Sequence, residues 1–245
     1  MIRSIKILKN NKKLRDAALA SDTIKVKKYL DKGADIESSK DGYTALLSAS
    51  TAANVDVICL LLDWGADITS CNKAGNTALI LATYYGKKDT VCLLLDRGAN
   101  INYLNKCGET ALMHASERGH ERILRLLLDR GCSIGNISAY GKTALMLACG
   151  RGKVKIFRML LDKGANVDAV DEDGKTVLMY ASYGGKKEII RKLLDRGAST
   201  DNVDCYGKTA LMYAIKNGNE EICRLLSERE TIAENTHMLK EAVYT

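Results

Sequence analysis

The chain has 245 residues, of which 46% are hydrophobic and 27% charged, and it contains no proline. Its apolar runs, such as 57–62, are far shorter than the roughly 20 residues that a membrane-spanning helix needs. The formal net charge is +7, and residues 1–40 carry most of it, with 11 Lys and Arg against 5 Asp and Glu. The rest of the chain is nearly neutral, which argues against nucleic-acid binding because phosphate neutralisation needs a basic surface.

The first nine residues are basic. No acidic residue precedes Asp16, and Ile2, Ile5 and Leu8 recur at helical spacing. Residues 1–9 are therefore predicted to form a basic N-terminal extension. Three roles stay open for it: a solvated extension, a weak contact for acidic partners or membrane surfaces, and an organelle presequence. Lysines interrupt the start of the chain, so it lacks the apolar stretch of a secretory signal.

Residues 10–40 contain Leu14-Arg-Asp-Ala-Ala18 and Val26-Lys-Lys-Tyr-Leu30, followed by Gly33-Ala-Asp35. This part is predicted to be an N-terminal capping repeat, because it ends like the later units but lacks their opening motif. Capping repeats present a polar outer face at the open end of a stacked array.

Residues 41–228 are built from one recurring unit, which opens with Gly-x-Thr-Ala-Leu or, once, Gly-x-Thr-Val-Leu. The spacing from one opening glycine to the next is constant, and a fixed period near 33 is typical of a stacked repeat array. We predict six further repeats, the last one truncated. They start at Gly42, Gly75, Gly108, Gly141, Gly174 and Gly207.

Two more glycine rows divide each unit, and the spacing predicts turns with positive φ at both. One row contains Gly86, Gly119, Gly152, Gly185 and Gly218, with Ala53 in place of glycine in the first unit; the other contains Gly65, Gly98, Gly131, Gly164 and Gly197.

Two helices are predicted in each unit. The first is short and begins at the threonine, whose hydroxyl can cap a helix N-terminus. Its alanine, for example Ala115, recurs at the same place in every unit and lets neighbouring helices approach closely. The second is longer, with apolar residues at i, i+3 and i+4, as in Ile123, Leu126 and Leu127.

These motifs resemble the ankyrin repeat family over roughly residues 12–228. Segments 65–68, 98–102 and 164–168 match the family's hairpin sequence, and Gly119-His120 matches the connection between its two helices. Two departures are systematic: alanine or valine replaces the family proline, and Leu, Ile or Met replaces the family histidine, as at Leu47, Ile80 and Met113. The resemblance implies an all-α solenoid of stacked helix-turn-helix units joined by short β-hairpin loops.

The resemblance further implies a non-enzymatic protein-protein interaction scaffold or adaptor. The scattered cysteines, interpreted as reduced thiols, favour the cytoplasm or nucleus. The scaffold would bind a protein partner through the hairpin tips and the concave face of the inner helices. One alternative is the regulatory or targeting array of an enzyme complex or of a longer natural chain. Another is a sensor of small molecules or nucleic acid.

Partner-binding residues are predicted at the positions that the family uses for contacts. These lie beside the opening glycine of each unit and just before the glycine of the row that contains Gly86. Tyrosine and arginine at such places are typical of binding hot spots. The alternative is that the hairpin tyrosines pack on neighbouring tips. The predicted partner-binding residues are Tyr43, Asn76, Tyr84, Tyr85, Glu109, Glu117, Arg118, Tyr140, Lys142, Arg151, Lys175, Tyr183, Tyr206 and Lys208. Trp64 is expected to be a partly exposed residue rather than an anchor.

Catalytic, cofactor and metal sites are not predicted. The eight cysteines are scattered without a Cys-x-x-Cys pair, which favours reduced and mostly packed thiols. His114, His120 and His237 lack metal-ligand spacing to them. Gly-Lys-Thr recurs once per repeat from 141 onward without the upstream glycine of a phosphate-binding loop, so the repeat explains it better.

Two further features have open interpretations. Asn102 is either a hairpin residue that shapes its turn or a substrate for the asparaginyl hydroxylases known to modify this family. Residues 229–245 form a C-terminal tail outside the repeat pattern, in which Asn235 or Thr236 is able to cap a short helix.

Overall fold

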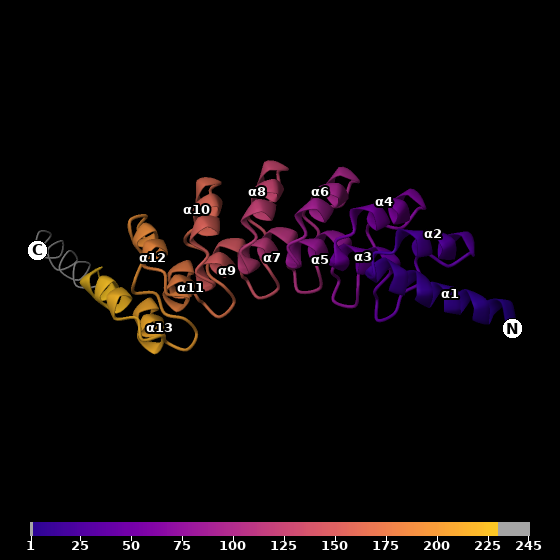
Figure 1. Cartoon of the computed structure of the whole chain (residues 1–245). Helices are drawn as coiled ribbons and strands as arrows, with labels where there is room; N and C mark the ends of the chain where they lie inside the picture. Colours follow the sequence, from indigo (N-terminus) through magenta and orange to yellow (C-terminus); the bar gives the residue numbers. More distant parts are fainter. Residues whose placement is uncertain (1, 230–245) are drawn as a thin grey trace, which may run out of the picture. The chain divides into compact units, whose positions relative to one another are not determined.

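The computed structural model describes residues 2–229, which fall into two compact units, the first ending at residue 133 and the second beginning at residue 134. Paired helices alternate with loops along each unit (Figure 1). The first unit contains α1 (Ile2–Leu19), α2 (Thr23–Asp31), α3 (Ala45–Ala52), α4 (Val55–Asp63), α5 (Ala78–Tyr84), α6 (Lys88–Asp96), α7 (Ala111–Arg118) and α8 (Glu121–Asp129). The second contains α9 (Ala144–Gly150), α10 (Val154–Asp162), α11 (Val177–Gly184), α12 (Lys187–Leu194) and α13 (Ala210–Lys216), and residues 220–229 are also helical.

Two rows of helices form each unit. In the first, α1, α3, α5 and α7 pack in succession as inner helices, and α2, α4, α6 and α8 form the outer row. In the second, α9, α11 and α13 are the inner helices, and α10 packs against α12. The loops that lead into the inner helices project on the side away from the outer row (Figure 1).

Threonine starts every inner helix after α1, as the sequence predicts. The Thr44 hydroxyl oxygen accepts a hydrogen bond from the backbone N–H of Leu47, three residues on. The same N-cap recurs at Thr77, Thr110, Thr143, Thr176 and Thr209. Each cap satisfies an amide that the helix itself leaves unpaired.

Burial differs between the two rows. Inner helices α3, α5, α7, α9 and α11 are largely buried, and their alanines, such as Ala115, are fully enclosed, which allows close helix packing. Outer helices bury one stripe, for example Ile123, Leu124 and Leu127 on α8. The positions where the family histidine is replaced also join the core, except for Met212, which is half exposed.

All three glycine rows have positive φ, which confirms the predicted turns, and Ala53 adopts the same conformation with φ 69°. Gly141 shows a second requirement. A Cβ placed there would lie 2.7 Å from the backbone nitrogen of Glu172 in the next hairpin. Glycine is therefore needed both for the backbone angle and for the approach of consecutive hairpins.

Hairpins between units are short. Four of them contain a single antiparallel bridge, as between Ile137 and Thr143 or Val170 and Thr176, and the described residues contain no longer strand. Backbone hydrogen bonds connect neighbouring hairpins, from Glu172 N to Tyr140 O (3.2 Å) and from Cys205 N to Asp173 O (2.7 Å).

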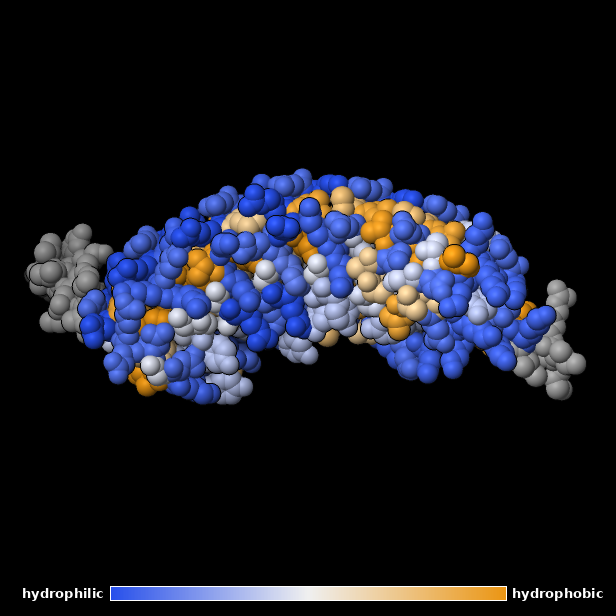
Figure 2. Space-filling model, viewed as in Figure 1, coloured by the Kyte–Doolittle hydropathy of each residue, from blue (hydrophilic) through white to orange (hydrophobic). Residues whose placement is uncertain are grey.

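The first helix is continuous from Ile2 to Leu19, so most of the predicted basic extension is helical. Leu14 and Ala18 are buried, whereas Leu8 is largely exposed. Of the predicted tail, residues 230–245 lie outside the described part. Hydrophilic residues predominate on the face seen in Figure 2, with apolar residues in separate groups. Among the described helices, none combines the length and apolarity needed to span a bilayer.

Candidate functional site

A polar side chain at the base of five of the six hairpins fixes the shape of the tip. Asp171 Oδ1 accepts hydrogen bonds from the backbone N–H groups of Asp173 (3.0 Å) and Lys175 (2.8 Å). The same two bonds, to the second and fourth following residues, recur in the five hairpins that follow the first. Their acceptors are Asn72, Asn105, Ser138, Asp171 and Asp204. These five tips, which carry seven of the predicted contact residues, are therefore held by internal hydrogen bonds.

In the second unit, tyrosines of two inner helices hydrogen-bond to the aspartate at the hairpin base. Tyr180 on α11 donates its hydroxyl to Asp171 Oδ2 at 2.7 Å, and Tyr213 on α13 donates to Asp204 Oδ2 at 2.5 Å. Burial, followed by the hydrogen bond to the aspartate, raises the pKa of both phenols, so they stay protonated donors. Both oxygens of each carboxylate are thus engaged inside the protein.

His114 occupies the corresponding place on α7 in the first unit. It is buried, and its Nε2 lies 3.5 Å from Glu109 Oε2. Burial lowers the pKa of His114, while Glu109 and then Glu117 act in the opposite direction. The imidazole packs edge-on against the ring of Tyr84, with centroids 5.6 Å apart.

An aromatic and arginine cluster covers the ends of α5 and α7. The Arg118 guanidinium lies 3.9 Å from the centroid of Tyr84 and also donates to the Tyr84 hydroxyl. Tyr85 meets Tyr84 edge-to-face at 5.1 Å and is half exposed. The structure thus brings Tyr84, Tyr85 and Arg118 together from two repeats, an arrangement typical of binding hot spots.

Tyrosine and lysine alternate on the hairpin tips of the second unit. Tyr140 and Tyr206 are 58% and 65% exposed. Lys142 Nζ lies 5.7 Å from the Tyr140 centroid, and Lys175 and Lys208 lie 5.6 and 5.8 Å from that of Tyr206. The tyrosines therefore contact lysines of their own and neighbouring tips and still expose more than half of their surface.

None of the other predicted contact residues is buried. Tyr183 and Arg151 are exposed near the ends of α11 and α9, and Glu117 is half-buried on α7. Tyr43 is half-buried beside its bridge partner Lys40. Asn76 and Glu109 accept hydrogen bonds from Asn105 Nδ2 at 2.8 and 3.1 Å, so they also stabilise hairpins. Trp64 is 44% exposed, as expected.

Sequence reasoning missed a row of exposed aliphatic side chains directly before four of the five hairpin bases. Leu104, Ile137, Val170 and Val203 share one repeat position and are each 48% to 60% exposed. We call Ile137, Val170 and Val203 of the second unit the aliphatic row. Their regular spacing was a usable signal, but β-branched residues between polar ones are ordinarily read as strand core.

All eight cysteines are free thiols. The prediction of packed thiols holds for Cys132 and Cys149, and burial raises the pKa of Cys132 to about 11. It is wrong for Cys71, Cys107 and Cys205, which are exposed because they stand on hairpins rather than on helices. Within residues 2–229, no group of three His, Cys, Asp or Glu side chains is placed to hold a metal ion.

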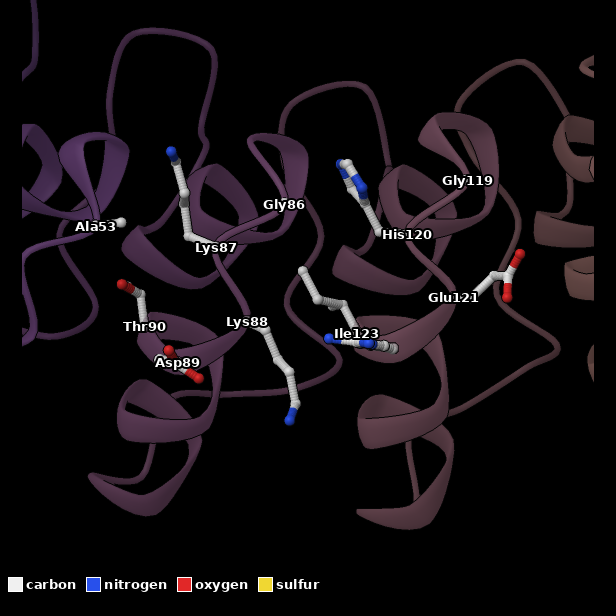
Figure 3. A pocket seen from close by; sticks show the side chains of 11 residues that line it. Ala53, Gly86, Lys87, Lys88, Asp89, Thr90, Gly119, His120, Glu121 and Ile123 are labelled. Atoms are coloured by element: carbon white, nitrogen blue, oxygen red, sulfur yellow. The ribbon is translucent and has the colours of Figure 1, made fainter.

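An open groove of about 630 Å³ lies along the turns before α6 and α8 (Figure 3). His120 borders it and fills the space beside Gly86, where a Cβ would approach its ring to 2.7 Å. Lys87 and Lys88 point in opposite directions, and Asp89 and Glu121 are interspersed with the basic residues (Figure 3). This mixture of charges does not form a recognisable catalytic arrangement.

A family model for ankyrin repeats in three copies matches residues 14–105, 98–171 and 163–237, which together cover most of the chain. The chain belongs to the ankyrin repeat family. Ankyrin repeats are generally protein-protein interaction modules and are typically non-enzymatic. No curated protein matches the sequence.

Asn102 of this ankyrin array lies exposed in the loop after α6. Its Oδ1 accepts a hydrogen bond from the backbone N–H of Ser133 at 2.8 Å, and its own N–H donates to Asn100 Oδ1. These bonds give Asn102 a role in shaping its loop. Hydroxylation of this residue stays an untested hypothesis.

Proposed function

We propose that the chain is a non-enzymatic scaffold or adaptor that binds a protein partner. The contact face consists of the hairpin tips and the C-terminal ends of the inner helices, with the fourteen residues predicted above as its contacts. The observation that supports this most is that every one of those side chains is at least partly exposed, while buried acceptors hold the backbone of the hairpin tips that carry seven of them, from Asn76 to Lys208.

Preorganisation supports the proposal energetically. A side chain on a fixed tip loses less conformational entropy on binding than one on a flexible loop. Tyr84, Tyr85 and Arg118 in the first unit and Tyr140 and Tyr206 in the second combine large area with polar atoms, as hot-spot residues do. A cytoplasmic or nuclear location is part of the same proposal.

Affinity capture from a native lysate tests this function. The intact chain serves as bait beside a variant in which Tyr84, Tyr85, Arg118, Tyr140, Arg151 and Tyr183 are alanine. Capture of a protein by the intact chain and its loss with the variant would support the proposed face. If neither bait retains any protein, the proposed function is contradicted.

A further inference from the structure

The first two helices of the first unit carry an excess of positive charge. Eight lysines on or next to α1 and α2 are exposed, and the same stretch contains four carboxylates. The lysines are Lys6, Lys9, Lys12, Lys13, Lys25, Lys27, Lys28 and Lys32, and the carboxylates belong to Asp16, Asp22, Asp31 and Asp35. Asp22 is already paired with Lys25, at 2.7 Å between Oδ2 and Nζ. Residues 6–13 of α1 include four of the lysines and no carboxylate.

This basic stretch projects from the fold. Helix α1 has 18 residues and α2 has 9, and the N-terminal end of α1 runs past α2 (Figure 1). Asn10 Nδ2 donates a hydrogen bond to the carbonyl oxygen of Lys32, at the C-terminal end of α2, over 3.4 Å. Residues 6–9 lie beyond this contact and are all exposed, Leu8 at 68%. We call the exposed side chains of Lys6, Leu8, Lys9, Lys12 and Lys13 the basic patch.

The side chains of the basic patch lie on one side of α1. Asn10, Asn11 and Leu14, which alternate with them along the chain, are buried. An α-helix places residues three and four apart beside one another, so every member of the patch lies next to another member. Lys13 also reaches α2, where its Nζ lies 5.8 Å from the centroid of the Tyr29 ring. The patch is therefore one continuous surface at the end of the first unit.

This arrangement does not stabilise the helix. Lys9 has three neighbours of the same charge, Lys6, Lys12 and Lys13, and like charges at these spacings destabilise a helix. Positive charge near a helix N-terminus is also unfavourable, because the macrodipole is positive there, and the first turn of α1 contains no acidic residue. A negatively charged surface against the patch would offset both effects.

We propose that the basic patch binds an anionic lipid bilayer. Its lysine ammonium groups pair with the lipid headgroups, and Leu8 inserts among them. Clusters of about four to eight lysines or arginines on a helix are typical of sites that bind anionic lipid headgroups. Among the roles open for the N-terminal extension, this selects the membrane contact. None of the patch residues belongs to the fourteen predicted contacts, so the inference goes beyond the proposed function and does not depend on it.

Three features favour a bilayer over other acidic surfaces. The charged members of the patch are all lysines, which lack the planar fork that makes arginine suited to bidentate recognition of a single phosphate or carboxylate. Exposed Leu8 suits a bilayer better than single-stranded nucleic acid, whose bases stack on aromatic side chains. A specific protein interface buries about 800 Å² on each partner, which is large for five side chains on one projecting helix.

The test measures sedimentation of the full chain with lipid vesicles at physiological ionic strength. One vesicle contains phosphatidylcholine alone, and the other contains equal parts of phosphatidylcholine and phosphatidylserine. The patch variant is K6Q/K9Q/K12Q/K13Q, in which glutamine keeps the helix propensity of lysine. A matched control, K88Q/K155Q/K163Q/K192Q, removes the same charge from exposed positions elsewhere. Polyglutamate and a single-stranded oligonucleotide are compared with the vesicles at equal negative charge, and Leu8→Ser tests the apolar contact.

The unmodified chain should sediment with the phosphatidylserine vesicles and not with phosphatidylcholine alone. Affinity should fall at least about tenfold in the patch variant and with added salt, and change little in the control. Leu8→Ser should weaken binding to the vesicles but not to polyglutamate. The patch variant should melt no lower than the unmodified chain, so lost binding would not reflect unfolding.

The inference is overturned if the chain does not sediment with phosphatidylserine vesicles, or if the patch variant and the control lose affinity equally. It is also overturned if polyglutamate or the oligonucleotide binds more tightly than the vesicles and loses affinity in the patch variant. Capture of a protein partner from lysate can still succeed in each of these cases, which separates failure of this inference from failure of the proposed function.

Discussion

The hydroxyl of Tyr180 donates a 2.7 Å hydrogen bond to Oδ2 of Asp171, and this contact connects inner helix α11 to the base of its own hairpin. The other oxygen of Asp171 holds the hairpin tip through two backbone N–H groups. One carboxylate therefore couples the helix to the tip that presents Lys175.

Replacing Tyr180 with Phe should lower the free energy of unfolding by about 1–3 kcal/mol, because it leaves one buried carboxylate oxygen without its donor. Asp171→Ala should lower the free energy of unfolding further, since it also leaves the backbone N–H groups of Asp173 and Lys175 without their acceptor. Urea denaturation measures both values. Equal losses for the two variants would show that the tip amides find other partners.

Stability should depend on pH through His114. Burial depresses its pKa in the folded protein below the ordinary 6.5, so the unfolded chain binds protons first as the pH falls. The contribution of His114 to stability is therefore present above about pH 6.5 and is lost progressively at lower pH. Replacement by leucine, the residue at the equivalent positions Leu81 and Leu147, should flatten the stability curve between about pH 6.5 and 5. Urea melts across that range check this; parallel curves for the two proteins would refute it.

Substitutions at two glycines of the same repeat position distinguish the cost of backbone strain from the cost of disturbed hairpin packing. Both Gly141 and Gly207 have positive φ, but only at Gly141 would a Cβ collide with the next hairpin. Gly207→Ala should cost about 1 kcal/mol for the backbone angle, and Gly141→Ala clearly more. The thermal midpoints decide this, with the smaller shift expected for Gly207→Ala. Similar shifts would mean that the contact with Glu172 relaxes freely.

Much of the fold could be predicted because each structural role in the repeat is filled by the same residue type in nearly every unit. Threonine caps such as Thr44 and turn glycines such as Gly141 have few substitutes, so the repeat period displays them directly. The hairpin base was missed because asparagine, serine and aspartate all supply the same acceptor, which hides the role from residue identity.

Contact residues were harder to predict than the fold. The repeat positions that the family uses for contacts led to exposed tyrosines such as Tyr140 and Tyr206. They did not reveal the exposed aliphatic row. Val170 looks like a strand core residue in the sequence, and only the three-dimensional structure shows that nothing covers it within its unit. Exposure of this kind depends on packing between repeats rather than on local sequence.

Binding of a purified, captured partner tests the central claim most directly. Isothermal titration compares the intact chain, the six-alanine variant at Tyr84, Tyr85, Arg118, Tyr140, Arg151 and Tyr183, and a control with Lys88, Arg122 and Lys155 on the outer helices replaced by alanine. Changes at the exposed positions should leave stability within about 0.5 kcal/mol per site, and Tyr84, which packs on His114, should cost more. Thermal melts of all three proteins therefore establish that lost binding does not reflect unfolding. We expect no measurable binding for the six-alanine variant, because such residues typically contribute about 2 kcal/mol or more each, and unchanged affinity for the control. Full affinity in the six-alanine variant, with loss in the control, would place the binding surface on the outer helices and contradict the account.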